Sequence, residues 1–288
     1  MEELLRGTPP VRPGAPLRRV ALVASLAALW LATSAGPASG AVTIGQLGTP
    51  SITCNSGLDW MQPSVTSGNA YVVPADGRIT SWSTNANASS GNLALKVFRH
   101  VSESTYEAVG HDGPRALTPS TLNTFGGLSI PVSPGDVLGV HPASNSLGCF
   151  FDAAGDSGMF FRAGELADGE SGDFTPFAVE VRLNVTAVVE PTNAFTLGKA
   201  KLNKRKGIAK LPADVPNAGK LVLSGKGLKK QTKTVDGAGK TKLIVKPKGR
   251  LRTMLEEKGR AKARAKVRYT PRGGDSRTRS RKVTLRKR

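Results

Sequence analysis

The residue types of a Ser-His-Asp triad occur in the middle of the chain. Ser157 lies within Gly155-Asp156-Ser157-Gly158, and His111 is followed directly by Asp112. Three histidines precede the serine: His100, His111 and His141. Acyl transfer by such a triad requires a base within hydrogen-bond reach of the serine, a buried orienting carboxylate and an oxyanion hole.

The surroundings of Ser157 argue against that chemistry. The motif is similar to the one around the nucleophile of trypsin-like proteases, but Met159 stands where that family has glycine. No histidine lies in an Ala-Ala-His-Cys context, and the segment 41–190 is too short for two barrels. Asp-Ser-Gly is a common turn sequence. We therefore predict a turn, assign no catalytic residue, and keep a serine hydrolase as the last alternative.

Metal ligation is weakly supported. The spacings of the three histidines match no short zinc motif, so we expect isolated polar or surface histidines. An acidic cluster could offer oxygen ligands to Ca²⁺, although its spacing is not that of an EF-hand: Asp152, Asp156, Glu165, Asp168, Glu170 and Asp173. A solvated acidic loop is the favoured interpretation, with Ca²⁺ binding left open. We predict no cofactor and no metal site.

The strongest candidate for binding is a row of cations near the C-terminus. Five basic residues alternate with small or apolar ones from 260 to 269: Arg260, Lys262, Arg264, Lys266 and Arg268. On a strand, alternate side chains point to opposite faces, so the five cations would share the solvent face. A helix would distribute them around its axis, and Gly259 disfavours a helix that starts there. We predict a strand and a polyanion-binding site.

Charge is distributed very unevenly along the chain. The net charge is +20, but residues 41–194 carry a net −8 and residues 195–288 a net +26. The basic segment would attract acidic glycans, wall phosphate polymers or nucleic acid. No aromatic residues are interspersed among the cations, and export removes nucleic acid as an expected partner. The alternative is that the charge serves only solubility or structure.

The first forty residues have the three parts of a secretory signal peptide. Arg18-Arg19 ends a basic leader, Val20 to Ala32 is an apolar run, and Ala38-Ser39-Gly40 precedes a cleavage site before Ala41. The run is shorter than the ~18 residues that a membrane anchor requires. We predict export to the cell surface or medium, by the general secretory or the twin-arginine route, and no membrane span in the mature form.

The chain has two cysteines, Cys54 and Cys149, both in the acidic segment. An even count in an exported chain favours a disulfide, which we predict here. Two buried free thiols are the alternative.

The elements that would position these residues are mostly strands. Residues 177–187 alternate between apolar and polar, which predicts one long half-buried strand. Shorter alternating or apolar runs cover 93–97, 128–132, 137–140, 149–151 and 159–161. We predict an acidic jelly-roll-like β-sandwich over residues 41–190, without an amphipathic helix.

After a linker at 191–194, short apolar runs recur between Gly-, Pro- and Lys-rich turns. They lie at 195–197, 207–211, 221–223, 243–245 and 283–285, and Leu251 to Lys258 has helical spacing over one or two turns. About seven strands in under 100 residues predict a basic immunoglobulin-like β-sandwich over 195–288.

Several strings resemble known modules. YVVPADGRITSW, LALKVFR, GHDGPRALTP and IPVSPGDVLGV resemble a β-sandwich module of secreted actinobacterial proteins, over most of 69–190. FTLGKAKLNKRKGIAKL, KLIVKPKGR and KVRYTPRGG resemble Lys/Arg-rich modules at the C-terminal ends of exported actinobacterial proteins. The first resemblance implies a fold without an activity, and the second implies an accessory or surface role.

The sequence therefore predicts an exported, non-enzymatic protein of two β-sandwiches after a signal peptide over 1–40. Its basic domain would associate with an anionic envelope polymer or acidic glycan. The alternatives are a purely structural spacer and a glycan-binding module, the latter requiring a groove lined by Trp60, Trp82 or Tyr71.

Overall fold

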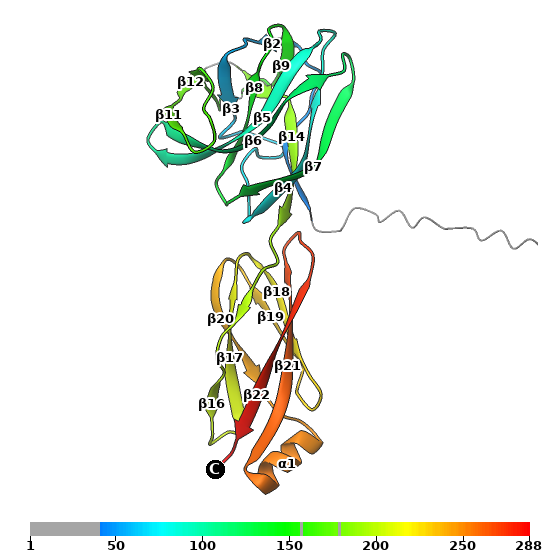
Figure 1. The fold of residues 1–288 in the computed structure, drawn as a ribbon, viewed down its shortest axis with the longest axis vertical. Helices are drawn as coiled ribbons and strands as arrows, with labels where there is room; N and C mark the ends of the chain where they lie inside the picture. Colours follow the sequence, from blue (N-terminus) through cyan, green and yellow to red (C-terminus); the bar gives the residue numbers. More distant parts are fainter. Residues whose placement is uncertain (1–40, 156–157, 178–179) are drawn as a thin grey trace, which may run out of the picture. The chain divides into compact units, whose positions relative to one another are not determined.

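The computed structural model describes residues 41–155, 158–177 and 180–288. The predicted signal peptide, and Asp156 and Ser157, lie outside the described residues. Nearly all regular elements are β-strands in antiparallel pairs, so the predicted all-β sandwich class is confirmed (Figure 1). The strands form two sets, β1–β14 and β15–β22, and no strand pairing among the described residues joins one set to the other.

The first set contains three sheets. One has four strands in the order β1 (Val42–Gln46), β14 (Val185–Pro191), β4 (Gly77–Asn85) and β7 (Leu122–Val132). The largest has the order β11 (Ser171–Asp173), β6 (Thr105–Leu117), β5 (Gly91–Ser102), β8 (Val137–Pro142), β3 (Leu58–Met61), β10 (Met159–Ala163) and β12 (Thr175–Phe177). A small sheet has the order β13 (Val181–Leu183), β9 (Leu147–Asp152) and β2 (Ile52–Cys54).

The main core of this set lies between the sheets. It includes Ile79 and Trp82 of β4, Leu95 of β5 and Phe150 of β9. The predicted disulfide between Cys54 and Cys149 is confirmed and is buried in this core. A smaller apolar cluster lies on the opposite face of the large sheet and includes Phe98, Leu166 and Phe174. Both faces of the central strands are consequently buried.

Burial of both faces corrects one prediction. The alternation of Leu93, Leu95 and Val97 with Ala94 and Lys96 indicated a half-buried strand, but every one of these residues is buried. The segment after β10, which contains Leu166, covers the second face of β5. The sequence pattern did not reveal this cover because the covering segment is about 70 residues away along the chain.

The single long strand predicted over 177–187 is wrong. Three strands lie there, and each has a different neighbour: β12 pairs with β10, β13 with β9, and β14 with β1 and β4. Arg182 and Asn184, predicted to face solvent, are buried. Asn184 is satisfied by the backbone, since it donates to the Asn85 carbonyl (3.0 Å) and accepts from Gly48 N–H (3.2 Å).

The second set contains two four-stranded sheets. In one, β17 (Ile208–Val215) is central and pairs with β15 (Thr196–Leu197), β16 (Lys201–Asn203) and β20 (Gly239–Val245). The other has the order β19 (Gln231–Val235), β18 (Gly219–Ser224), β21 (Arg260–Pro271) and β22 (Arg277–Arg286). Two of these eight strands, β16 and β19, were not among the predicted runs, because they carry few apolar residues.

The core of the second set is aliphatic apart from Phe195 and Tyr269. Tyr269 is fully buried and donates a hydrogen bond to the Asn217 carbonyl at 2.7 Å. Burial raises the pKa of Tyr269 to about 12, despite the opposing effect of that hydrogen bond.

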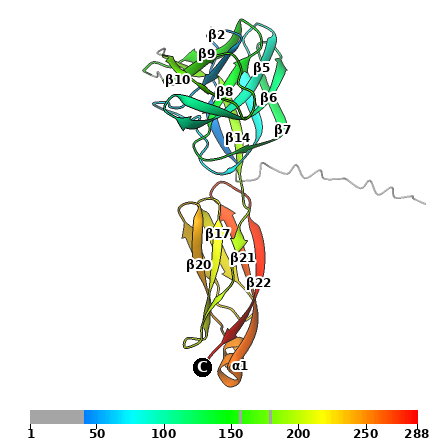
Figure 2. The same cartoon turned by 60° about the vertical axis from the view of Figure 1, so that its left-hand side comes forward.

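The predicted short helix is confirmed as α1 (Arg250–Lys258), which buries Leu255. Gly259 ends the helix with φ 62°, a left-handed conformation that glycine adopts without strain. The chain can then enter β21 at Arg260. Figure 2, like Figure 1, shows α1 at the same end of its sandwich as the C-terminus.

Candidate functional site

The predicted row of five cations lies on β21. Arg260, Lys262, Arg264, Lys266 and Arg268 are all exposed. The intervening Ala261, Ala265, Val267 and Tyr269 are buried in the core, with Ala263 half-buried. The predicted strand and its two faces are thus confirmed, while the polyanion-binding role remains a prediction.

The neighbouring strand extends this cationic surface. In the antiparallel register, Arg286 lies opposite Arg260 and Lys282 lies opposite Arg264. Residues opposite one another share a face, so these cations lie beside those of β21. We call the seven side chains the basic face: Arg260, Lys262, Arg264, Lys266, Arg268, Lys282 and Arg286.

No carboxylate of the described residues forms an ion pair with the basic face. The ion pairs described in the second sandwich involve Glu256, which contacts Arg252 (2.9 Å) and Lys287 (3.7 Å). Neither cation belongs to the basic face. Like charges directly opposite each other destabilise a strand pair. The basic face therefore carries uncompensated repulsion, which an anion bound on it would relieve.

The spacing of the basic face suits an extended polymer. Residues two apart on one strand are about 6.6–6.8 Å apart, because each residue rises about 3.3–3.4 Å. The five cations of β21 thus form a linear array. At one end lies a shallow hollow of about 500 Å³, where Lys230, Lys266 and Arg268 are accompanied by the hydroxyls of Ser224 and Thr278.

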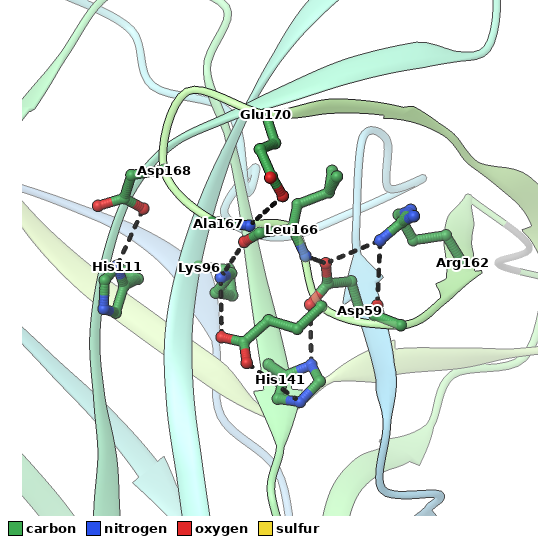
Figure 3. Close-up of polar contacts among 11 residues, drawn as sticks. Asp59, Lys96, His111, His141, Arg162, Leu166, Ala167, Asp168 and Glu170 are labelled. Carbon is green, nitrogen blue, oxygen red and sulfur yellow. Dashed lines mark hydrogen bonds and ion pairs between the residues drawn. The ribbon is translucent and has the colours of Figure 1, made fainter.

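A second concentration of polar side chains lies in the first sandwich (Figure 3). Asp59 of β3 is fully buried; its carboxylate accepts hydrogen bonds from His141 Nδ1 (2.9 Å) and from the Leu166 N–H (2.9 Å). Arg162 of β10 lies opposite Asp59 in register, with Nη1 3.8 Å from Oδ2. Three adjacent strands therefore bring together an arginine, an aspartate and a histidine.

Lys96 joins this network from β5. Its buried Nζ donates to the Leu166 carbonyl (2.6 Å) and to Glu165 Oε1 (3.0 Å). Burial raises the pKa of Glu165, but the hydrogen bond and charge of Lys96 outweigh burial and hold that pKa below its ordinary value. Glu165 Oε2 lies 3.8 Å from His141 Nε2. The network thus fixes the segment 164–170 over the large sheet.

These contacts correct the prediction of isolated histidines. His141 is buried against Asp59, and His111 Nδ1 lies 2.9 Å from Asp168 Oδ1. His100 and His111 fit the prediction in part, since both are exposed; His100 contacts the Glu103 carbonyl. The sequence did hint at the network, because Lys96 interrupts the apolar run Leu93–Phe98.

The acidic cluster does not converge on one point in the described residues. Glu165 contacts Lys96, Asp168 contacts His111, and Asp173 accepts from Thr105 Oγ1 (2.6 Å). Glu170 accepts from the Ala167 N–H (3.0 Å). No group of three or more potential metal ligands occurs in the part of the chain that the structure describes. Asp156 and Ser157 lie outside that part, so the structure does not test the hydrolase alternative.

The aromatic groove expected for glycan binding is not formed by the residues proposed for it. Trp60, Trp82 and Tyr71 are all buried, with at most 4% of each residue exposed. Trp60 packs against Phe150, Phe161 and Phe177, and Trp82 donates to Asp112 Oδ2 (2.7 Å). These rings fill the core instead of stacking on a ligand.

Comparison with known proteins adds little. No protein-family model matches the chain, and a search of curated proteins finds no match. A solved β-1,2-glucanase from Parabacteroides distasonis shares 13% identity with a TM-score of 0.18, over 86% of this chain and 37% of that enzyme. The chain thus spans about a third of the enzyme's length. A likeness this low indicates neither a shared fold nor a shared function. Among the described residues, no helix has the length and apolar character needed to cross a membrane.

Proposed function

We propose that this chain is an exported, non-enzymatic binding protein that associates with anionic polymers of the cell envelope through the basic face. The observation that carries the proposal is the row of five exposed cations on β21, flanked by Lys282 and Arg286 and unpaired with any described carboxylate. Stability alone would not select such an arrangement, because opposed like charges weaken a sheet.

Two further observations support this assignment. The disulfide between Cys54 and Cys149 fits an oxidising compartment outside the cytoplasm, as the predicted signal peptide requires. The hydroxyls of Ser224 and Thr278 beside Lys266 and Arg268 can donate hydrogen bonds to phosphate or carboxylate oxygens. A linear polyanion would thus gain both charge neutralisation and directed contacts.

The test is binding of the full chain to long-chain inorganic polyphosphate and to isolated envelope polymer at rising salt. A single-stranded phosphate polymer loses affinity with a slope of about 0.7 in log salt for each phosphate contacted. Five contacts give a slope of about 3.5, so affinity should fall about 100-fold between about 50 and 200 mM salt. Neutral dextran should not bind.

A matched pair of variants separates the basic face from net charge. One replaces Arg260, Lys262, Arg264, Lys266 and Arg268 with glutamine. The control replaces five exposed lysines elsewhere in the second sandwich: Lys201, Lys210, Lys240, Lys242 and Lys246. The first should abolish most of the salt-dependent binding, whereas the control should retain most of it.

Two results would reject the proposal. Equal losses in both variants would show that net charge, not the basic face, attracts the polymer. Absence of binding even at low salt would leave the spacer as the better account. The glycan-binding alternative is disfavoured by the burial of Trp60, Trp82 and Tyr71.

A further inference from the structure

An open pocket of about 610 Å³ lies beside the first turn of α1 in the second sandwich. It is bordered by the 226–227 turn after β18, the segment 248–249, the start of α1 and the first half of β21. Its volume lies within the range of small-molecule sites, about 300–1,000 Å³. All of its walls come from the second sandwich.

The pocket combines two kinds of surface. Five cations line it: Lys226, Lys248, Arg250, Lys262 and Arg264. Among the described residues, its lining includes no acidic side chain. Leu251, Met254 and Ala263 line it as well. Met254 is 36% exposed and is one of four large hydrophobic residues exposed in the described part of the chain.

This combination restricts the ligand class. A hydrophilic phosphate polymer gains nothing from Leu251 and Met254, and a neutral apolar ligand gains nothing from five cations. A molecule with an anionic head and an apolar body satisfies both surfaces, since burial of apolar area and pairing of charge would then occur together. Basic pockets recognise the phosphate headgroups of lipids on the same principle.

We propose that this pocket binds a phosphate-bearing lipid, with its phosphate among Lys226, Lys248 and Arg264 and its acyl chain against Leu251 and Met254. The site goes beyond the proposed polymer binding, although Lys262 and Arg264 belong to both surfaces. A protein retained by polymer on the basic face would thereby bind a second ligand, a single lipid molecule.

The experiment is calorimetric titration of the full chain with dioctanoyl phosphatidylglycerol below its critical micelle concentration. Glycerophosphoglycerol supplies the same phosphodiester anion without the acyl chains, and octyl glucoside supplies an alkyl chain without the phosphate. We expect the lipid to bind at least about tenfold more tightly than either fragment, because only the lipid fills both surfaces.

Variants outside the basic face locate the site. Lys226→Gln with Lys248→Gln should weaken lipid binding about tenfold through the loss of two charge contacts. Met254→Ser should weaken it about five- to tenfold through the loss of apolar burial. The matched control, Lys240→Gln with Lys242→Gln, removes two exposed lysines of β20 and should change affinity less than about twofold. Circular dichroism and thermal melting confirm that each variant is folded.

Several outcomes would overturn the proposal. Glycerophosphoglycerol binding as tightly as the lipid would indicate a plain anion site, and octyl glucoside doing so would indicate a plain apolar site. Absence of lipid binding, or unchanged binding in Met254→Ser, would also reject it. Polyphosphate binding should be unaffected by Met254→Ser, so failure of this site and failure of the basic face are distinguishable.

Discussion

At the scale of single residues, Asp59 is a fully buried carboxylate of the first sandwich. It accepts hydrogen bonds from His141 and from the Leu166 backbone, with Arg162 nearby. A buried charge is tolerated only when such partners compensate for lost hydration. Asp59 therefore holds the covering segment 164–170 against β3 and β8.

Replacing Asp59 with alanine should lower the free energy of unfolding by about 3 kcal/mol, because it leaves a buried N–H and a buried imidazole without their acceptor. Urea denaturation followed by tryptophan fluorescence measures the loss, since Trp60 and Trp82 lie in this sandwich. The matched control is Asp168→Ala, which removes a half-exposed carboxylate from His111.

Asp168→Ala should cost less than about 1 kcal/mol, because exposed ion pairs contribute little. Similar losses in the two variants would show that the Asp59 contacts do not hold the covering segment.

At the scale of elements, the pairing of β21 with β22 opposes its own electrostatics. Arg260 faces Arg286 and Arg264 faces Lys282 across the ladder. The pair persists because the other face of both strands enters the core, where Ala265, Val267, Val283 and Leu285 are buried. Apolar burial outweighs the repulsion, and an anion bound on this face would reduce it.

The repulsion can be measured directly. Lys282→Glu should place a carboxylate opposite Arg264 and raise the free energy of unfolding by about 0.2–1 kcal/mol at low salt. Lys282→Gln should give an intermediate value. Thermal melting at low and high salt tests this order, and the differences should shrink as salt screens the exposed charges. A lower melting temperature for Lys282→Glu at low salt would contradict the assigned register or the repulsion.

At the scale of the whole molecule, the two sets of strands differ in how they are stabilised. The first has a net charge of −8 over 41–194, a disulfide and an interior with aromatic clusters. The second has a net charge of +26 over 195–288 and a mainly aliphatic core without cysteine. We expect the covalent link to matter for the first sandwich alone.

The disulfide prediction is tested by the double variant Cys54→Ala with Cys149→Ala. The cross-link joins residues 95 apart, and loss of such a link typically costs about 2–5 kcal/mol through a freer unfolded chain. Denaturation followed by the fluorescence of Trp60 and Trp82 reports on the affected sandwich. A reducing agent should destabilise the native chain but leave the double variant unchanged. Equal stability of the two proteins would refute the expected contribution.

The sequence by itself determined the local features of this protein. The alternation from 260 to 269 specified a strand with one cationic face, because a period of two leaves no other arrangement of side chains. The short helix at 250–258, ended by Gly259, followed from the spacing of neighbouring residues. The disulfide followed from the cysteine count, since two cysteines allow a single pairing. The all-β class followed from strand patterns bounded by turns.

The tertiary structure alone decided which faces are covered and which distant residues meet. Lys96, Arg182 and Asn184 are buried because segments far along the chain cover them, and periodicity within one strand contains no information about such cover. Asp59, His141 and Glu165 come together only through the order of β3, β8 and β10 in the large sheet. The pocket beside α1 likewise depends on how the helix packs on β21. Strand order and packing are set by the sum of long-range contacts, so they appear only when the whole chain has folded.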